Sequence, residues 1–214
     1  MARAEQPPSA ERDGEVTARL REAIIDLVCE RSYAQTSVVA ICDRVGVEVD
    51  VFTRAYGSKE QAFLRIYSEE SERLLAATRG AYDSEETWRD ALRAAAYATA
   101  RWIQRHPRET RFCVLEALSA GEAARLEREK TLWHFIDLVD RSRQGLDDPG
   151  SVPQSFAAAI VGAIAEMLLR RIAAGKDLSR AESLVPEMMY IAVRPYVNKD
   201  EAEQELSLPP PPHV

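Results

Sequence analysis

The sequence predicts an all-α protein. Apolar residues recur at helical spacing through most of the 214 residues, and capping or turn residues separate the periodic segments. The segment VGVEVDVFTR (45–54) instead alternates valines with polar residues and glycine, as a strand would. A single short strand without a partner is not stable. The whole chain is therefore expected to be helical.

The composition indicates an ordinary globular protein of the reducing cytoplasm. Apolar residues make up 46% and charged residues 29%, and no apolar stretch is long enough to cross a membrane. The N-terminus lacks the pattern of a secretory signal. Cys29, Cys42 and Cys113 are few and far apart, which favours free thiols over disulfides. Both Cys29 and Cys42 are expected to be small core residues, although a redox-sensing role is the alternative.

Four segments follow from the pattern. Residues 1–14 are expected to be a disordered arm, 15–60 a small helical domain, 61–198 a larger helical domain, and 199–214 a disordered proline-rich tail. In the larger domain, helices are expected over about 85–105, 107–120, 122–144, 153–174 and 179–197, the last one bent at Pro186.

The small domain reads as a helix-turn-helix. An amphipathic helix over 15–31 is followed by Thr36 or Ser37 as a cap, and Gly46 can end the next helix in a left-handed conformation. Ser58, with Gln61 three residues later, begins another helix. Between these signals, residues 45–54 are best explained as a tight turn and a short helix, with the valine alternation a coincidence.

These residues resemble the N-terminal domain of the TetR/AcrR family of transcriptional regulators. The stretch TSVVAICDRVGVEVDVFTRAYGSKEQAF, preceded by ARLREAIIDLVCERSYAQ, retains the positions that carry the family pattern. They are Tyr33, Thr36, Ser37, Ile41, Gly46, Val47, Phe52, Tyr56, Ser58, Lys59 and Glu60. This motif covers about the first third of the chain.

The resemblance implies a homodimer that binds a palindromic DNA operator and releases it when an inducer binds the larger domain. The residues carried over as candidate DNA contacts are Thr36, Ser37, Glu48, Val49, Thr53, Arg54, Tyr56 and Lys59. Of these, Lys59 matches a lysine that contacts phosphate in the family.

The recognition helix departs from the family pattern. Glu48 and Asp50 stand where hydroxyl, glycine or proline residues are usual, and residues 1–60 hold eleven acidic and eight basic residues in a chain of net charge -7. Carboxylates repel phosphate, so nonspecific DNA affinity should be poor. The alternative function is therefore a TetR-like ligand-binding or protein-interaction module without ordinary DNA binding. Equally, both acids can simply favour the positive end of a helix.

The larger domain is expected to hold a pocket for a small apolar ligand and the dimer interface. Candidate pocket residues are Trp88, Trp102, Phe112, Trp133, Phe135 and Met167, although aromatic residues at helical spacing are more often plain core. Two apolar helices, near 153–174 and 180–197, are expected to form the homodimer interface rather than a core within one subunit.

No signature of catalysis or of a cofactor is present. The sequence lacks G-x-S-x-G, H-E-x-x-H, C-x-x-C and G-x-G-x-x-G. His106 and His134 lack the neighbouring ligands that a metal site needs. We therefore expect neither an enzyme nor a metal or cofactor site.

Overall fold

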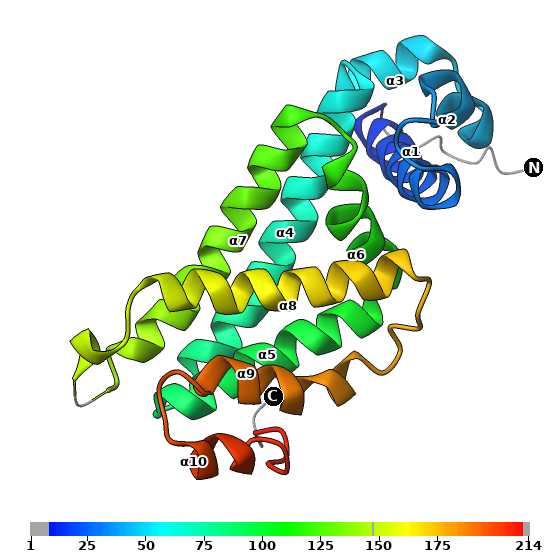
Figure 1. Cartoon of the computed structure of the whole chain (residues 1–214). Coiled ribbons are helices and arrows are strands. Elements are labelled where there is room, and N and C mark those ends of the chain that lie inside the picture. The colour runs from blue at the N-terminus through cyan, green and yellow to red at the C-terminus, as the bar shows by residue number, and fades with distance from the viewer. Residues whose placement is uncertain (1–8, 147, 212–214) are drawn as a thin grey trace, which may run out of the picture.

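The computed structural model describes residues 9–146 and 148–211, and within these ranges it contains helices and no strand. Figure 1 shows a small group of helices at one end and a larger bundle below it. The α-helices are α1 (Ser9–Arg31), α2 (Val38–Val45), α3 (Val49–Tyr56), α4 (Lys59–Asp83), α5 (Trp88–Arg105), α6 (Pro107–Val114), α7 (Glu122–Arg143), α8 (Ser155–Ala173), α9 (Val185–Val193) and α10 (Lys199–Gln204). The all-α prediction is confirmed.

The first three helices and the start of α4 form a small unit, called the head below, with an apolar core. Its centre consists of aliphatic side chains of α1 and α2 packed on Phe52 of α3 and Phe63 of α4. The core continues into the body through Phe112 of α6, whose ring stacks on Phe63 at a centroid distance of 4.3 Å. The head is therefore joined to the body by packed aromatic rings.

The body is a bundle around α4, α5 and α7, with α8 and α9 on its outside (Figure 1). Helix α4 packs against α5 and α7, while α9 packs against α5. A second apolar core includes Trp102 and Ile103 of α5, Val161 of α8 and Met189 of α9. No helix among residues 9–146 and 148–211 is long and apolar enough to cross a membrane.

The two ends of the chain differ from the expectation of disorder. Helix α1 begins at Ser9 rather than Glu15, so residues 9–14 are helical, while the rest of the expected arm (1–8) lies outside the described residues. In the expected tail, α10 forms and buries Ala202 completely. Residues 212–214 of that tail lie outside the described part of the chain.

The expected tail is held to the body by a buried carboxylate. Glu205 is 1% exposed and accepts hydrogen bonds from Arg89 and Arg93 of α5 at distances between 2.8 and 3.1 Å. This pairing joins residues more than a hundred positions apart, so it could not be predicted from the pattern of neighbouring residues. Pro186 likewise lies in the first turn of α9, where proline is tolerated, instead of bending a longer helix.

Candidate recognition helix and ligand cavity

The turn before α3 has the geometry expected from its sequence. Ser37 caps α2 by accepting a hydrogen bond from the backbone N–H of Ala40 at 3.1 Å. Gly46 ends α2 with φ of +76°, and its N–H donates to the carbonyl of Cys42 at 2.8 Å. A side chain in this left-handed conformation would be strained, so glycine suits the turn. Residues 45–54 are thus a turn and a helix, as predicted.

Helix α3 has one buried and one exposed face. Phe52 and Tyr56 point into the head, and the Tyr56 hydroxyl donates to the carbonyl of Thr17 at 3.4 Å. The exposed face carries four of the candidate DNA contacts, Glu48, Val49, Thr53 and Arg54. Glu48 is the N-cap residue, but its side chain makes no capping hydrogen bond. Its carboxylate therefore remains available to a partner outside the head.

Three other candidate DNA contacts are engaged inside the head. Thr36 is buried, and its hydroxyl donates to the carbonyl of Ser32 at 2.8 Å. The Lys59 ammonium donates to the carbonyls of Tyr33 and Thr36 at 3.0 and 2.9 Å and lies 4.1 Å from the centroid of the Tyr33 ring. Burial lowers the pKa of Lys59. The head is thus stabilised by contacts of Thr36, Tyr56 and Lys59. The remaining candidate, Ser37, is exposed and caps α2.

The cations around α3 are paired with acids. The Arg54 guanidinium lies 2.5 Å from the Asp50 carboxylate one turn earlier, and Arg44 of α2 lies 3.0 Å from Glu30 of α1. These pairs are exposed and contribute little to stability. They nevertheless neutralise much of the positive charge that this face could present to phosphate.

Ion pairs also cross the boundary between head and body. Arg108, at the start of α6, donates to Glu22 and Asp26 of α1. Arg21 of α1 donates to Glu70 of α4, which also accepts from Arg73 at 2.6 Å. Glu70 is 1% exposed and lines the cavity in the body. One carboxylate therefore touches both the head and the cavity.

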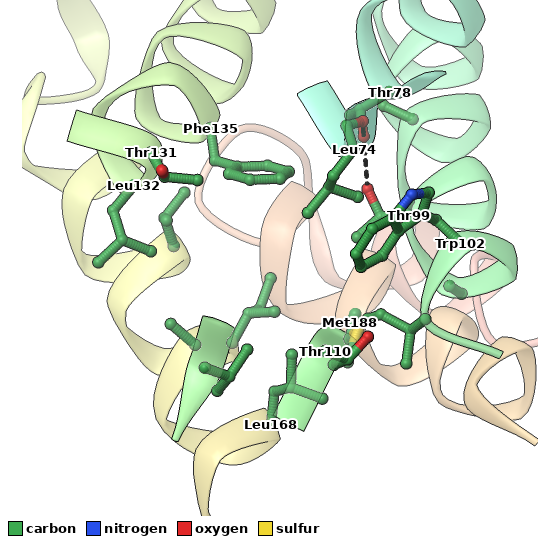
Figure 2. Close-up of a pocket in the computed structure, with 18 of the residues that line it drawn as sticks. Leu74, Thr78, Thr99, Trp102, Thr110, Thr131, Leu132, Phe135, Leu168 and Met188 are labelled. Atoms are coloured by element: carbon green, nitrogen blue, oxygen red, sulfur yellow. Dashed lines mark hydrogen bonds between the residues drawn. The ribbon is translucent and has the colours of Figure 1, made fainter. Parts of the chain in front are cut away.

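The body encloses a cavity of about 220 Å³ between α4, α5, α6, α7, α8 and α9. Most of its lining is apolar, and Figure 2 shows Leu74, Trp102, Phe135, Leu168 and Met188 around the space. The hydroxyls of Thr78 and Thr99 also line it and lie 3.0 Å apart. Such a partly enclosed apolar space with a few polar groups is typical of small-molecule sites.

Of the six residues predicted for the pocket, Trp102 and Phe135 line the cavity. The other four lie outside the lining of this cavity. Trp88 packs on Tyr196 at a centroid distance of 5.9 Å, and Phe112 stacks on Phe63. Trp133 is 58% exposed on α7, and Met167 lies outside the cavity lining. Helical spacing showed that these residues share apolar faces, but not which face adjoins an empty space.

The polar end of the cavity holds groups that the sequence did not single out. The Tyr67 hydroxyl donates to the Thr131 hydroxyl at 3.2 Å, and Thr131 donates to the carbonyl of Glu127 at 3.0 Å. Arg128, also on α7, lines the same cavity. Burial raises the pKa of Tyr67, and it also raises the pKa of Cys113, another lining residue. Both groups are therefore neutral near pH 7.

The two helices expected to form a dimer interface expose apolar side chains. On α8, Phe156 is exposed together with Ala159, Gly162 and Ala163, and on α9 Ile191 is exposed. Small residues on an exposed helix face let a second helix approach closely. Across residues 9–146 and 148–211, no cluster of side chains could hold a metal ion.

Comparison with solved structures gives the fold a family context. No family model and no curated protein matches the sequence. A TetR-like transcriptional regulator from Rhodococcus sp. RHA1 is 20% identical, with a TM-score of 0.70 over 91% of this chain and 100% of that chain. The TetR family transcriptional regulator PfmR from Thermus thermophilus is 21% identical, with a TM-score of 0.65 over 90% and 100%.

A third match was solved with a ligand. It is the transcriptional regulator FadR from Bacillus subtilis in complex with stearoyl-CoA, which is 14% identical, with a TM-score of 0.65 over 84% of this chain and 99% of that chain. All three of these proteins are transcriptional regulators. Across most of its length, this chain has the fold of TetR-family transcriptional regulators.

Proposed function

We propose that this protein is a ligand-responsive DNA-binding transcriptional regulator of the repressor type, acting as a homodimer on a palindromic operator. The observation that carries the proposal is the combination of an exposed α3, held from behind by Phe52 and Tyr56, with an apolar cavity in the body. A helix presented in this way fits the major groove of DNA. The cavity gives a second molecule a place from which to change that helix's position.

The exposed face of α3 suits direct reading of bases. The Glu48 carboxylate can accept a hydrogen bond from cytosine N4, and Val49, which is 44% exposed, can contact a thymine methyl group. Thr53 and Arg54 lie one turn further along the same helix. Because Arg54 is paired with Asp50, we expect affinity to depend more on base contacts than on phosphate attraction.

The dimer would use the exposed faces of α8 and α9. Phe156 and Ile191 would become buried against the second subunit, and the small residues of α8 would allow close helix packing. Two heads on one dimer would then meet two half-sites about one helical turn of DNA apart. This arrangement is what makes a palindromic operator the expected target.

The inducer would be a small apolar molecule bound in the cavity. Support comes from the apolar lining around Trp102 and Phe135. The FadR match, crystallised with stearoyl-CoA, adds an example of an acyl-CoA bound to a protein of this fold. Ligand binding would release DNA through the contacts between body and head, in particular Glu70 with Arg21 and Arg108 with α1.

The test is an electrophoretic mobility shift with DNA flanking the protein's own gene, at low and at moderate salt. A shift that an unrelated duplex does not compete away supports the proposal, and Glu48→Ser should alter sequence preference. Phe156→Glu should abolish dimerisation in sedimentation and weaken the shift. Absence of a shift at both salt concentrations, with the dimer intact, would exclude operator binding.

One observation favours a second function. The Asp50–Arg54 pair and the uncapped Glu48 leave α3 with a more acidic exposed face than a DNA-binding helix normally has. The same fold could then act as a ligand-binding or protein-interaction module without DNA binding. If Glu48→Ser with Asp50→Gly creates DNA binding where the unmodified protein has none, this second function is the correct one.

A further inference from the structure

The cavity has an uneven distribution of charge. Its lining includes only two ionised side chains, Glu70 and Arg128, among the residues that the structure describes. Glu70 is already matched, because Arg21 and Arg73 both donate to its carboxylate. Its negative charge is therefore satisfied by the protein itself, and a ligand gains little by approaching it.

Arg128 is in the opposite situation. Among the side chains described, those of residues 13–146 and 148–211, none forms an ion pair or a hydrogen bond with its guanidinium. The positions three and four residues away on α7 hold Ala124, Arg125, Thr131 and Leu132, none of which is an acid. Helical neighbours therefore cannot neutralise it.

Three other cations of the same helix are paired with acids. Lys130 pairs with Glu127 at 2.7 Å, Arg141 with Asp137 at 2.9 Å, and Arg143 with Asp140 at 2.9 Å. Each of these pairs uses the spacing of three or four residues that Arg128 lacks. Arg125 of this helix has no ion pair among the described residues either, but it is exposed, whereas Arg128 is partly buried beside the cavity.

The hydroxyls near Arg128 are already committed. Tyr67 donates to Thr131, and Thr131 donates onward to a backbone carbonyl. The guanidinium is close enough to Tyr67 to oppose, in part, the rise that burial causes in the pKa of that phenol. At this end of the cavity, the charged donor still available to a ligand is therefore the Arg128 guanidinium, while the Ser71 hydroxyl also lines the cavity but carries no charge. A planar guanidinium that can donate two parallel hydrogen bonds matches a carboxylate or a phosphate.

We propose that the cavity binds a single-chain amphiphile whose anionic head, a carboxylate or a phosphate, pairs with Arg128 and whose apolar tail lies among Leu74, Trp102, Phe135 and Met189. The inference rests on the proposed function for its regulatory meaning, but the binding itself does not depend on DNA. A cationic head would meet Arg128 and find Glu70 already paired. A neutral head such as an alcohol can accept a hydrogen bond from the guanidinium but leaves its charge uncompensated, which is less favourable than pairing with an anion.

The test compares ligands that differ only in the head. Binding of dodecanoate, dodecanol and dodecanoyl-CoA is measured by calorimetry with the full chain, and octanoate and hexadecanoate vary the length of the tail. We expect dodecanoate or dodecanoyl-CoA to bind roughly ten- to a hundredfold more tightly than dodecanol, as a charge-assisted pair implies. The stronger of these two anions identifies whether the carboxylate or the phosphates of the thioester pair with Arg128.

Two variants isolate the role of the arginine. Arg128→Met should remove the preference for the anion while leaving dodecanol binding unchanged. Arg125→Met, an exposed cation one turn earlier, is the matched control and should keep the preference. Equal affinity for acid and alcohol in the unmodified protein, equal loss of both in Arg128→Met, or no binding of any of these chains would overturn the inference. None of these outcomes affects the DNA shift, so this inference can fail while the proposed function stands.

Discussion

The candidate recognition helix, α3, and the cavity differ in how their cations are paired. Around α3, Arg54 is paired with Asp50, Arg44 with Glu30, and Lys59 with two backbone carbonyls. In the body, Arg128 lines an apolar cavity and has no acidic neighbour three or four positions away on its own helix. The exposed face of α3, which is proposed to bind DNA, therefore has little unpaired positive charge, whereas the cavity has the guanidinium of Arg128.

The difference shows why a count of charges does not locate an anion site. The head and the body both contain many arginines, yet most of those described form ion pairs with nearby carboxylates, as Arg21 and Arg108 do. What matters is whether a cation retains hydrogen-bond donors after the protein has satisfied its own groups. In this protein, that criterion favours the cavity for anion binding and base-edge contacts for α3.

Packing provides the largest contrast between the two regions. Phe63 is fully buried in the filled core between head and body, whereas Phe135 borders the cavity. We expect Phe63→Ala to lower the free energy of unfolding by about 3–5 kcal/mol and Phe135→Ala by only about 1–2 kcal/mol, because the second side chain leaves a space that is already partly empty. Chemical denaturation followed by circular dichroism measures both. Equal losses would mean that the cavity is filled in solution.

The next largest loss of stability is expected from a change at Glu70, the buried carboxylate at the boundary between head and body. Glu70→Gln removes the charge that Arg21 and Arg73 share, so we expect a loss of about 3 kcal/mol in the free energy of unfolding. Glu69→Gln, one residue away and much more exposed, is the control and should cost less than about 1 kcal/mol. If the two variants are alike, the Arg21–Glu70 contact does not hold the head to the body.

Thiol reactivity should distinguish the head from the cavity. Burial raises the pKa of Cys29 from 9.0 to about 11 and that of Cys113 further. At pH 8 the Cys29 thiolate should be roughly a hundredfold scarcer than that of a free thiol, since each pKa unit is a factor of ten. Labelling with a chromogenic disulfide should therefore be slow for Cys29, slower for Cys113, and faster for Cys29 as the pH approaches 11.

The same shifts give a direction for stability. Because the folded state holds these thiol protons to higher pH than the unfolded chain does, their contribution is complete below about pH 9 and is lost as the pH rises towards the folded pKa values. Rapid labelling of Cys29 at about pH 8 in the native protein would show that α1 separates from α6 in solution.

The smallest expected effect concerns the charge of α3. Asp50→Asn releases Arg54 and removes a carboxylate from the exposed face, so nonspecific DNA affinity at low salt should rise about three- to tenfold. The salt dependence should steepen by about one released counterion. Asp43→Asn, an exposed acid of α2, is the control for net charge alone. An equal gain in both variants would show that Arg54 is not the group released.

Features controlled by neighbouring residues were predictable from the sequence. Gly46 marks the turn, Ser37 and Ser58 cap the following helices, and Phe52 lies on the inner face of α3. Each depends on contacts within about four positions. The Asp50–Arg54 pair also has this spacing and could have been found from the sequence in the same way.

Features controlled by distant residues were not predictable in this way. The turn after α1 brings two carbonyls to the ammonium of Lys59, and no pattern of neighbouring residues predicts that contact. Trp102 and Phe135 line the cavity, whereas Trp88 and Trp133 do not. The positions at which helices cross determine where a cavity forms, and these positions cannot be derived from helical spacing. Arg128 carried no local signal except the lack of an acidic neighbour at helical spacing, and its place at the cavity follows only from the packing of α7.

The pairing of Glu205 with Arg89 and Arg93 has a practical consequence for the design of shortened forms of this protein. The run of prolines near the C-terminus invites truncation just after α9. Such a cut would remove the carboxylate that two arginines of α5 share, and it would leave Arg93, which is 7% exposed, with Asp90 as its remaining acidic partner. Removing one partner of a buried ion pair typically costs about 3–5 kcal/mol, and the remaining Asp90 would offset part of that cost. A shortened chain should therefore retain Glu205 rather than stop at the end of the apolar helices.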